Sequence, residues 1–183
     1  MGGLRGLSLL AATVSMGLGA GVYALYAHTI MPGLGHTDDR TFVAAFQEID
    51  RAIINPWFIG FSFIGSLLLG VLAAVLNFRR PALRWILAAV LLYLVVMVIT
   101  VAVNVPLNDA IKAAGDPKSI ADLGAVRAAF DEATWQTWNL VRALLCIASF
   151  VCLAWALMLH GRSTATSQLL TAPPRASEGQ SVN

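Results

Sequence analysis

Charge is scarce in this sequence, and long basic runs are absent. Asp, Glu, Lys and Arg make up 12% of the 183 residues, whereas 58% of the residues are hydrophobic. Soluble domains average about 25% charged and roughly 45–50% apolar residues. The small net charge of +2 and the missing basic runs argue against a nucleic-acid-binding surface. The composition therefore predicts a membrane protein, and the length suits one domain.

Cysteine is nearly absent too. The two cysteines do not indicate whether the protein resides in an oxidising or a reducing compartment. Cys146 and Cys152 lie in the same apolar segment. Their separation on a helix is about 9 Å by rise alone, which is beyond the reach of a disulfide. We interpret both as small buried hydrophobic residues.

Metal-ligand motifs are missing as well. Four acidic or imidazole side chains could converge on a metal, but no His-x-x-Glu or Glu-x-x-His pair is present. These four are His28, Glu48, Asp50 and Asp109. Paired histidines and a Cys-x-x-Cys motif, typical of haem or quinone redox proteins, are also missing. We therefore expect no metal and no cofactor.

What the sequence does have is four long apolar segments. Each is near the roughly 20 residues that a helix needs to cross a bilayer, and helices satisfy their own backbone hydrogen bonds there. The predicted fold class is all-α, an integral membrane four-helix bundle with extra amphipathic helices on its outer side. We predict a transmembrane domain over residues 1–162. Its spans are residues 7–28, 57–78, 84–103 and 138–159.

The first apolar segment resembles a secretory signal peptide in having Arg5 before it and small residues within it. It stays apolar for longer than the roughly 7–15 residues of a signal-peptide core, however. We therefore predict that residues 7–28 are a retained span.

The basic residues indicate the orientation. Arginines flank the predicted spans on one side, whereas the segments 29–56 and 104–137 on the other side are richer in acids. The flanking residues are Arg5, Arg79, Arg80, Arg84, Arg162 and Arg175. By the positive-inside rule, we expect a multi-pass protein of the cell membrane with both termini cytoplasmic and the lipid bilayer as its partner. Residues 163–183, rich in Ser, Thr and Pro, are predicted to form a disordered cytoplasmic tail.

The two outer segments contain further helical patterns. Residues 38–54 place apolar side chains on one stripe, and Asp38 or Asp39 can cap the start of the helix. Residues 119–137 are predicted to be helical, with Ser119 as the cap, and to run straight into the fourth span. Both patterns favour a helical layer over the outer end of the bundle.

Proline and glycine mark two further features of the spans. Pro106 is expected to break or kink the end of the third span. Gly17 and Gly21 form a small-xxx-small pair, which would let a neighbouring helix approach the first span closely.

The segment Trp-Gln-Thr-Trp-Asn-Leu-Val-Arg (135–142) opens the fourth span. Trp135, Trp138, Asn139 and Arg142 are spaced i, i+3, i+4 and i+7, so a helix places all four on one face. A charge inside a span costs roughly 2.5–3.5 kcal/mol at the helix centre and less near its ends. Arg142 should therefore face the bundle interior, pair with another group or extend to the interface.

Polar side chains occur at the same membrane level at every other outer boundary. The candidate partners of Arg142 are acids, amides and one histidine, namely Asp50, Glu48, Asp109, Asn55, Asn104, Asn108 and His28. We predict that they converge on an outward-facing polar pocket with tryptophan walls. A purely structural interpretation is also open, in which Arg142 pairs with one carboxylate to lock the bundle and the tryptophans anchor the interface.

Three segments, in order between the apolar spans, resemble the anthrone-oxygenase-like family of small four-helix membrane proteins. They are FQEIDRAIINPWF (46–58), NVPLNDAI (104–111) and W-x-x-W-N-x-x-R (135–142), and MPGL (31–34) is similar as well. The resemblance covers about residues 7–160. Most members are assigned only to a domain of unknown function. Some oxidise an anthrone to an anthraquinone with molecular oxygen and no known metal or flavin.

The resemblance implies a cofactor-independent oxygenase acting on an anthrone-like or other small aromatic substrate. Such chemistry needs a base, a cation for the developing enolate and an aromatic slot. The candidate catalytic residues are His28 or Asp50 as the base and Arg142 as the enolate stabiliser. The substrate-binding candidates are Asn55, Trp57, Asn104, Asn108, Asp109, Trp135, Trp138 and Asn139. The alternative is a non-catalytic protein that holds a lipid, a quinone-like ligand or a partner helix in the same pocket.

Overall fold

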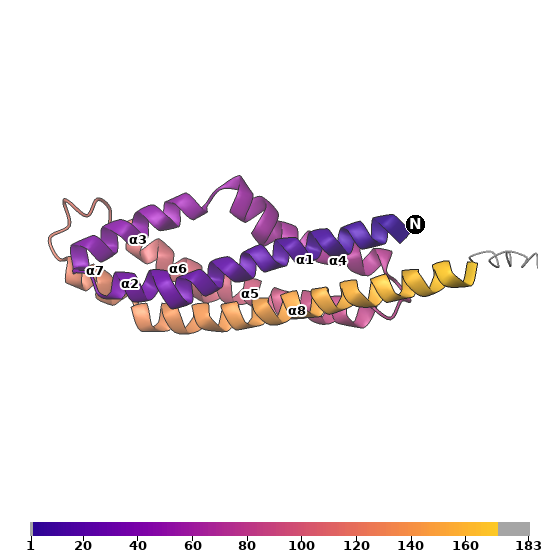
Figure 1. Ribbon diagram of the computed structural model, residues 1–183. Helices are drawn as coiled ribbons and strands as arrows, with labels where there is room; N and C mark the ends of the chain where they lie inside the picture. The colour runs from indigo at the N-terminus through magenta and orange to yellow at the C-terminus, as the bar shows by residue number, and fades with distance from the viewer. Residues whose placement is uncertain (1, 172–183) are drawn as a thin grey trace, which may run out of the picture.

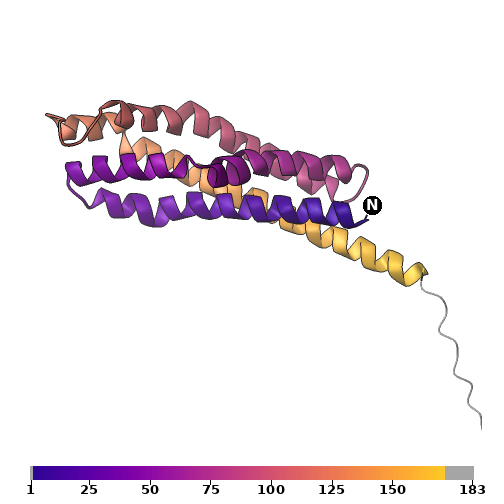
Figure 2. The same cartoon turned by 90° about the horizontal axis from the view of Figure 1, so that it is seen from above.

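Four long helical rods, side by side, form the protein. The computed structural model describes the backbone of residues 2–171 and the side chains of residues 3–163. The rods that are long and apolar enough to span a membrane are Gly3–Gly35, Pro56–Leu76, Leu83–Ala113 and Leu123–Ser163. Figures 1 and 2 show them as one elongated all-α bundle. This is the architecture that the apolar segments predict.

Most rods combine α-helical and π-helical pieces. In chain order the elements are α1 (Gly2–Leu25), η1 (Tyr26–Ile30), α2 (Met31–Gly35), α3 (Asp39–Ile53), η2 (Pro56–Ile64), α4 (Gly65–Leu76), α5 (Leu83–Ile99), η3 (Thr100–Asn104), α6 (Val105–Ala113), α7 (Leu123–Phe130) and α8 (Glu132–Thr171). The elements η1, η2 and η3 are π-helical. We call the end with α2, α3, α6 and α7 the cap end. The N-terminus and the α4–α5 turn lie at the opposite end (Figure 1).

The core of the bundle lies where α1 and α5 pack against α8. Its largest fully buried side chains include Leu9, Met16, Ile86, Tyr93 and Leu153. The opposite faces of the rods carry exposed leucine, valine and phenylalanine side chains. An apolar outer surface on such long helices fits contact with lipid.

Only one glycine of the small-xxx-small pair lies at a close helix contact. A Cβ atom at Gly17 would lie 3.0 Å from a ring carbon of Phe150 on α8. A Cβ atom at Gly21 would meet nothing within 4 Å. Gly17 therefore permits α1 to approach α8, and Gly21 does not contribute.

A separate apolar core joins the helices at the cap end. Phe42, Phe46, Phe130 and Trp135 are buried together there. The Phe46 and Phe130 ring centroids are 4.5 Å apart, and Trp135 meets Phe46 edge to face at 5.7 Å. The apolar stripe of α3 thus packs on α7 and the start of α8, as its periodicity indicates.

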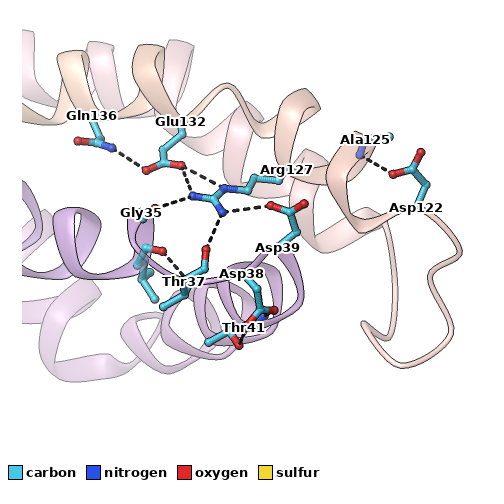
Figure 3. A network of polar contacts seen from close by, with 11 residues as sticks. Gly35, Thr37, Asp38, Asp39, Thr41, Asp122, Ala125, Arg127, Glu132 and Gln136 are labelled. Atoms are coloured by element: carbon cyan, nitrogen blue, oxygen red, sulfur yellow. Dashed lines mark hydrogen bonds and ion pairs between the residues drawn. The ribbon is translucent and has the colours of Figure 1, made fainter.

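Arg127 connects the chain segments of the cap (Figure 3). Its guanidinium donates to the backbone carbonyls of Gly35 and Thr37, at 3.2 and 3.0 Å. The same group forms ion pairs with Asp39 at 3.1 Å and Glu132 at 3.0 Å. One side chain therefore holds the α2–α3 connection against the α7–α8 junction.

The helix boundaries at the cap correct two of our expectations. Asp122, and not Ser119, caps the helix before the fourth span, since its carboxylate accepts from the Ala125 amide at 2.9 Å. That helix also does not run straight into the fourth span, because Asp131 adopts a left-handed conformation with φ 48° between α7 and α8. Asp38 caps α3, as expected, and accepts from the Thr41 amide at 3.0 Å.

Two further expectations concern where helices end, and the structure differs from part of each. Pro106 does not end its helix, because the chain widens into the π-helical turn η3 and places the proline in the first turn of α6, where no amide hydrogen is needed. Helix α8 continues to Thr171. The tail predicted to be disordered from residue 163 therefore begins as helix, and residues 172–183 lie outside the described residues.

Candidate functional site

A cavity of about 290 Å³ lies inside the bundle at the cap end. Small-molecule sites usually measure roughly 300–1,000 Å³, so this one suits a small ligand. Its walls come from all four rods and from α3. The lining residues are Val22, Tyr23, Tyr26, Phe46, Asp50, Ile53, Ile54, Phe58, Ile59, Phe63, Thr100, Val105, Asn108, Asp109, Lys112, Trp135, Asn139 and Arg142.

Each of the three π-helical segments contributes a wall of this cavity. Tyr26 comes from η1, Phe58 and Phe63 come from η2, and Thr100 comes from η3. A π-helical turn is wider than an α-helical turn, and such turns occur frequently at functional sites. Here the widened turns lie at one level of the bundle and surround one space.

Arg142 is buried in the cavity wall, with 5% of its surface exposed. Its Nη1 donates to Thr100 Oγ1 at 3.2 Å, and its Nη2 donates to Asn139 Oδ1 at 3.0 Å. The guanidinium carbon lies 4.8 Å from the Tyr23 ring centroid and 5.6 Å from that of Trp135. All of these partners are neutral, so they orient the guanidinium without cancelling its charge.

Of the alternatives open for Arg142, the structure shows the first, since the side chain is buried and faces the bundle interior. Within the part of the chain that the structure describes, no carboxylate forms an ion pair with Arg142, and its Nε has no hydrogen-bond partner. Asn139 is itself fixed, because its Nδ2 donates to the Tyr23 carbonyl at 3.1 Å. The cavity thus presents a held cation to whatever occupies it.

The acid at this level belongs to a different network. Asp50 is 5% exposed, and its Oδ2 forms an ion pair with Lys112 Nζ at 2.8 Å. Asn108 donates to Asp50 Oδ1 at 2.6 Å and accepts from Trp135 Nε1 at 2.6 Å. Lys112 also reaches Asp109 at 3.1 Å. Two hydrogen-bonded neighbours therefore hold one carboxylate in place at the cavity wall.

The structure brings about half of the predicted site residues together. Those that line the cavity are Asp50, Asn108, Asp109, Trp135, Asn139 and Arg142. Those that lie elsewhere are His28, Asn55, Trp57, Asn104 and Trp138. The sequence predicts one membrane level for both groups, but only the first group lines the cavity.

Three of the residues outside the cavity make other contacts. His28 is exposed, and its Nδ1 is hydrogen-bonded to the Thr29 hydroxyl at 2.6 Å. Asn55 caps η2, since it accepts from the Phe58 amide at 2.9 Å. Asn104 is buried and donates to the Trp135 carbonyl at 3.2 Å.

Two of the predicted tryptophans do not line the cavity and are exposed. Trp57 is 64% exposed and stacks on Phe61 with ring centroids 5.0 Å apart. Trp138 is 38% exposed and lies at the edge of the helix face that carries Trp135 and Arg142. Of the three predicted slot tryptophans, only Trp135 forms part of the wall.

Sequence reasoning did not identify Tyr23, Tyr26, Thr100 and Lys112 as site residues. Tyr23 and Tyr26 are three residues apart in the first span, a spacing that places them on one helix face with their polar ends available. Lys112 follows Asp109 by three residues on a helix, so an ion pair between them could also have been predicted from the sequence. Thr100 gives no sequence signal, because threonine is unremarkable in an apolar span.

Metal ligands do not cluster here. Among the described residues, no group of three or more His, Cys, Asp and Glu side chains gathers. Cys146 is buried in the bundle core and Cys152 is partly buried, in agreement with their interpretation as small hydrophobic residues.

The rods and the cavity define a class: a small multi-pass membrane protein with a ligand-sized cavity that contains a buried cation. A family model described as anthrone oxygenase matches residues 55–152. Since this is more than half of the chain, the protein belongs to the anthrone oxygenase family. The match includes Asn108, Trp135, Asn139 and Arg142 of the cavity wall. No curated protein and no solved structure matches the chain.

Proposed function

We propose that this protein is a membrane oxygenase that converts a small anthrone-like aromatic compound to the corresponding quinone with molecular oxygen. The observation that carries the proposal is Arg142, a buried cation with neutral partners in an aromatic-walled cavity. A cation held in this way stabilises an oxyanion as it forms. Family membership supports the same chemistry.

The proposed reaction needs one base, which we assign to Asp50. An anthrone carries an acidic CH₂ group between two aromatic rings, and Asp50 would remove one of its protons. The negative charge moves to the ketone oxygen, which Arg142 and Asn139 are arranged to hold. Lys112 and Asn108 keep the carboxylate in position. His28, the other candidate base, is exposed and does not line the cavity.

The oxidation itself requires only dioxygen. The carbanion transfers one electron to O₂, and the resulting pair combines to form a C–O bond. A proton then gives the hydroperoxide, which loses its remaining C–H proton and hydroxide from the O–O bond, leaving C=O. In sum, the CH₂ group and O₂ become C=O and H₂O. This sequence runs without a metal or a flavin, and Asp50 can return the proton that it removed.

A second candidate function is binding without chemistry. One observation favours it, because the one carboxylate that is buried in the cavity wall is already in an ion pair with Lys112. In this alternative the cavity holds a lipid or a quinone-like ligand, and Arg142 recognises its polar group. A partner helix is the third occupant compatible with the alternative.

Oxygen uptake with anthrone separates the candidates. The protein is placed in phosphatidylcholine liposomes, and O₂ consumption and anthraquinone formation are measured above the spontaneous rate in empty liposomes. The enzyme should lose activity in Asp50→Asn, by about 100-fold or more as a missing general base does. The matched control His28→Ala should retain activity, since that side chain is exposed.

Binding is measured separately, under argon, by the quenching of intrinsic tryptophan fluorescence by anthrone, to which Trp135 in the cavity wall contributes. Asp50→Asn should still bind anthrone if its role is proton transfer. Anthrone binding by the unaltered protein without O₂ uptake would refute the enzyme and support the binding protein. Neither binding nor uptake would refute the anthrone oxygenase and an anthrone-binding role alike.

We also propose the orientation that the basic flanks predict, with the cap end outside the cell membrane and both termini cytoplasmic. The four apolar helices support a multi-pass protein. The test is the labelling of intact cells by a membrane-impermeant amine reagent. Lys118, in the exposed α6–α7 connection, should react without permeabilisation. Labelling only after permeabilisation would reverse the orientation.

A further inference from the structure

We propose that the ligand enters this cavity sideways from the bilayer, between the α3–η2 connection and the start of α6. The inference rests on the proposed function only in taking the cavity as the ligand site. Three lining residues are exposed: Ile54 at 59%, Val105 at 39% and Asp109, whose side chain is 63% exposed. All the other lining residues are buried or partly buried. The mouth of the cavity is therefore where these three residues lie.

The helix lengths place the apolar part of this mouth at the edge of the hydrocarbon layer. The rod Pro56–Leu76 has 21 residues, so at α-helical rise it is at most about 31 Å long, and slightly shorter because η2 is π-helical. That length matches the hydrocarbon core of about 30 Å, so Pro56 marks the boundary at the cap end. Ile54 lies two residues before Pro56, at the same edge.

The third rod gives the same level independently. It starts at Leu83, after the arginine-rich turn at the opposite boundary. By helical rise Val105 lies about 33 Å further along, whereas Thr100 lies about 26 Å along and is still inside the hydrocarbon layer. Lys112, about 44 Å along, lies beyond it. The mouth therefore has the apolar residues Ile54 and Val105 at the lipid boundary. The charged residues Asp109 and Lys112 lie on its water side, which we call the roof.

The opening lies at the bend between α3 and the second rod, at Asn55. The Asn55 side chain donates to the Ala52 carbonyl and accepts from the Phe58 amide, both at 2.9 Å. Asn55 therefore fixes the bend next to Ile54, which is a different role from the substrate contact that the sequence suggested. Figure 1 shows α3 diverging from the rod at this bend.

The two sides of the mouth favour different ligands. On the water side, the ion pair of Lys112 with Asp50 joins α6 to α3, and Lys112 also pairs with Asp109 on its own helix. A ligand entering there would have to separate the pair that joins the two helices. On the lipid side, Ile54 and Val105 present only hydrocarbon. The ligand class is therefore a flat apolar molecule dissolved in the bilayer, with one acidic oxygen that reaches Arg142 at hydrocarbon depth.

Cysteine labelling tests the route without relying on catalysis. Val22 lines the cavity and is partly buried, so Val22→Cys changes little volume. It is introduced with Cys146→Ala and Cys152→Ala, and the protein is placed in phosphatidylcholine liposomes. Two probes are compared: pyrenylmaleimide, which partitions into lipid, and a sulfonated maleimide, which stays in water. Rates are normalised to those of the denatured protein.

The expected result has two parts. Val22→Cys reacts at least about tenfold faster with pyrenylmaleimide than with the sulfonated probe. Adding Ile54→Trp at the mouth slows the pyrenylmaleimide reaction by about tenfold, because the larger ring fills the gap. A matched reporter, Leu68→Cys on the lipid-facing surface, keeps its rate whether or not Ile54→Trp is present.

Faster labelling by the sulfonated probe would overturn lateral entry and indicate a route through the roof. An unchanged pyrenylmaleimide rate in Ile54→Trp would overturn the location of the mouth. If Ile54→Trp fails to fold, Val105→Phe takes its place with the same expectation. None of these outcomes depends on oxygen uptake, so a failure of the proposed enzyme activity is scored separately.

Discussion

Replacing Arg142 by leucine should separate a ligand-holding cation from a structural one. The change removes the charged donors to Thr100 Oγ1 and Asn139 Oδ1, which are worth about 1.5 kcal/mol each at the lower end of the range for charged groups. It also removes the cost of keeping a charge in a span, which is roughly 2.5–3.5 kcal/mol at the helix centre and less near the end. Because these effects oppose each other, the free energy of unfolding should change by only about 1 kcal/mol.

The effect on the reaction should be much larger. Loss of a group that stabilises a developing oxyanion lowers rates by about 100- to 1,000-fold. Anthrone binding should weaken less, by about tenfold, which corresponds to the roughly 1.5 kcal/mol lower end for a charged hydrogen bond. Arg142→Lys is the matched control, since it keeps the charge but not the planar pair of donors, and it should retain part of the activity.

Three measurements on liposome or micelle samples decide the matter: O₂ uptake, fluorescence titration with anthrone under argon, and reversible unfolding in mixed micelles. Removing one partner of a buried ion pair costs about 3–5 kcal/mol. A loss of that size in Arg142→Leu, with O₂ uptake kept in the remaining folded protein, would show that the guanidinium only locks the bundle. The reasoning from its neutral partners would then be refuted.

Three further predictions concern the cap and the helix contacts. Arg127→Ala should lower the free energy of unfolding by about 3 kcal/mol in mixed-micelle unfolding, whereas removal of the exposed Arg51 by the same substitution should cost about 0–1 kcal/mol. Equal losses would mean that the cap network is not stabilising. Gly17→Val should lower the free energy of unfolding by about 1–3 kcal/mol in the same assay, because the new Cβ would press on Phe150 of α8. Gly21→Val should lower it by about 0.5 kcal/mol or less, since a Cβ there meets nothing within 4 Å. The reverse order would contradict the helix contact at Gly17. Hydrogen bonds from the first turn of α3 hold the pKa of Asp38 below its ordinary value, so its carboxylate stabilises that turn above about pH 4 and loses this effect as the pH falls through the lowered pKa. The protection factor of the amides in that turn, which is the intrinsic exchange rate at each pH divided by the observed rate, should therefore fall on acidification. Asp38→Asn should abolish this fall, and a fall that persists in the variant would assign it to another group.

Local sequence patterns were enough to predict the four long helical rods and α3. Spans long enough to cross a bilayer must be helical, because no water is available there to satisfy a free backbone. The stripe of α3 and its Asp38 cap were likewise readable, since both depend on residues within one or two turns of each other. The helix face that carries Trp135, Asn139 and Arg142 follows from spacing alone.

Contacts between distant segments were not readable in this way. His28 and Asp50 both lie at the predicted outer boundary, yet only Asp50 points into the cavity, because the rotation of each helix about its axis is set by its neighbours. Spacing could not show that Asp50 would pair with Lys112, since the two residues meet only when α3 folds over α6. The widened π-helical turns also gave no sequence signal of their own.

The sequence by itself determined that this protein is a bundle of apolar helices with a polar level near one end, because hydrophobic length and helical spacing are local properties. The tertiary structure decided which side chains of that level share a cavity. It also decided that Arg142 meets neutral partners while Asp50 meets Lys112. Those outcomes depend on how five separate segments pack, and no single segment encodes the orientation of the others.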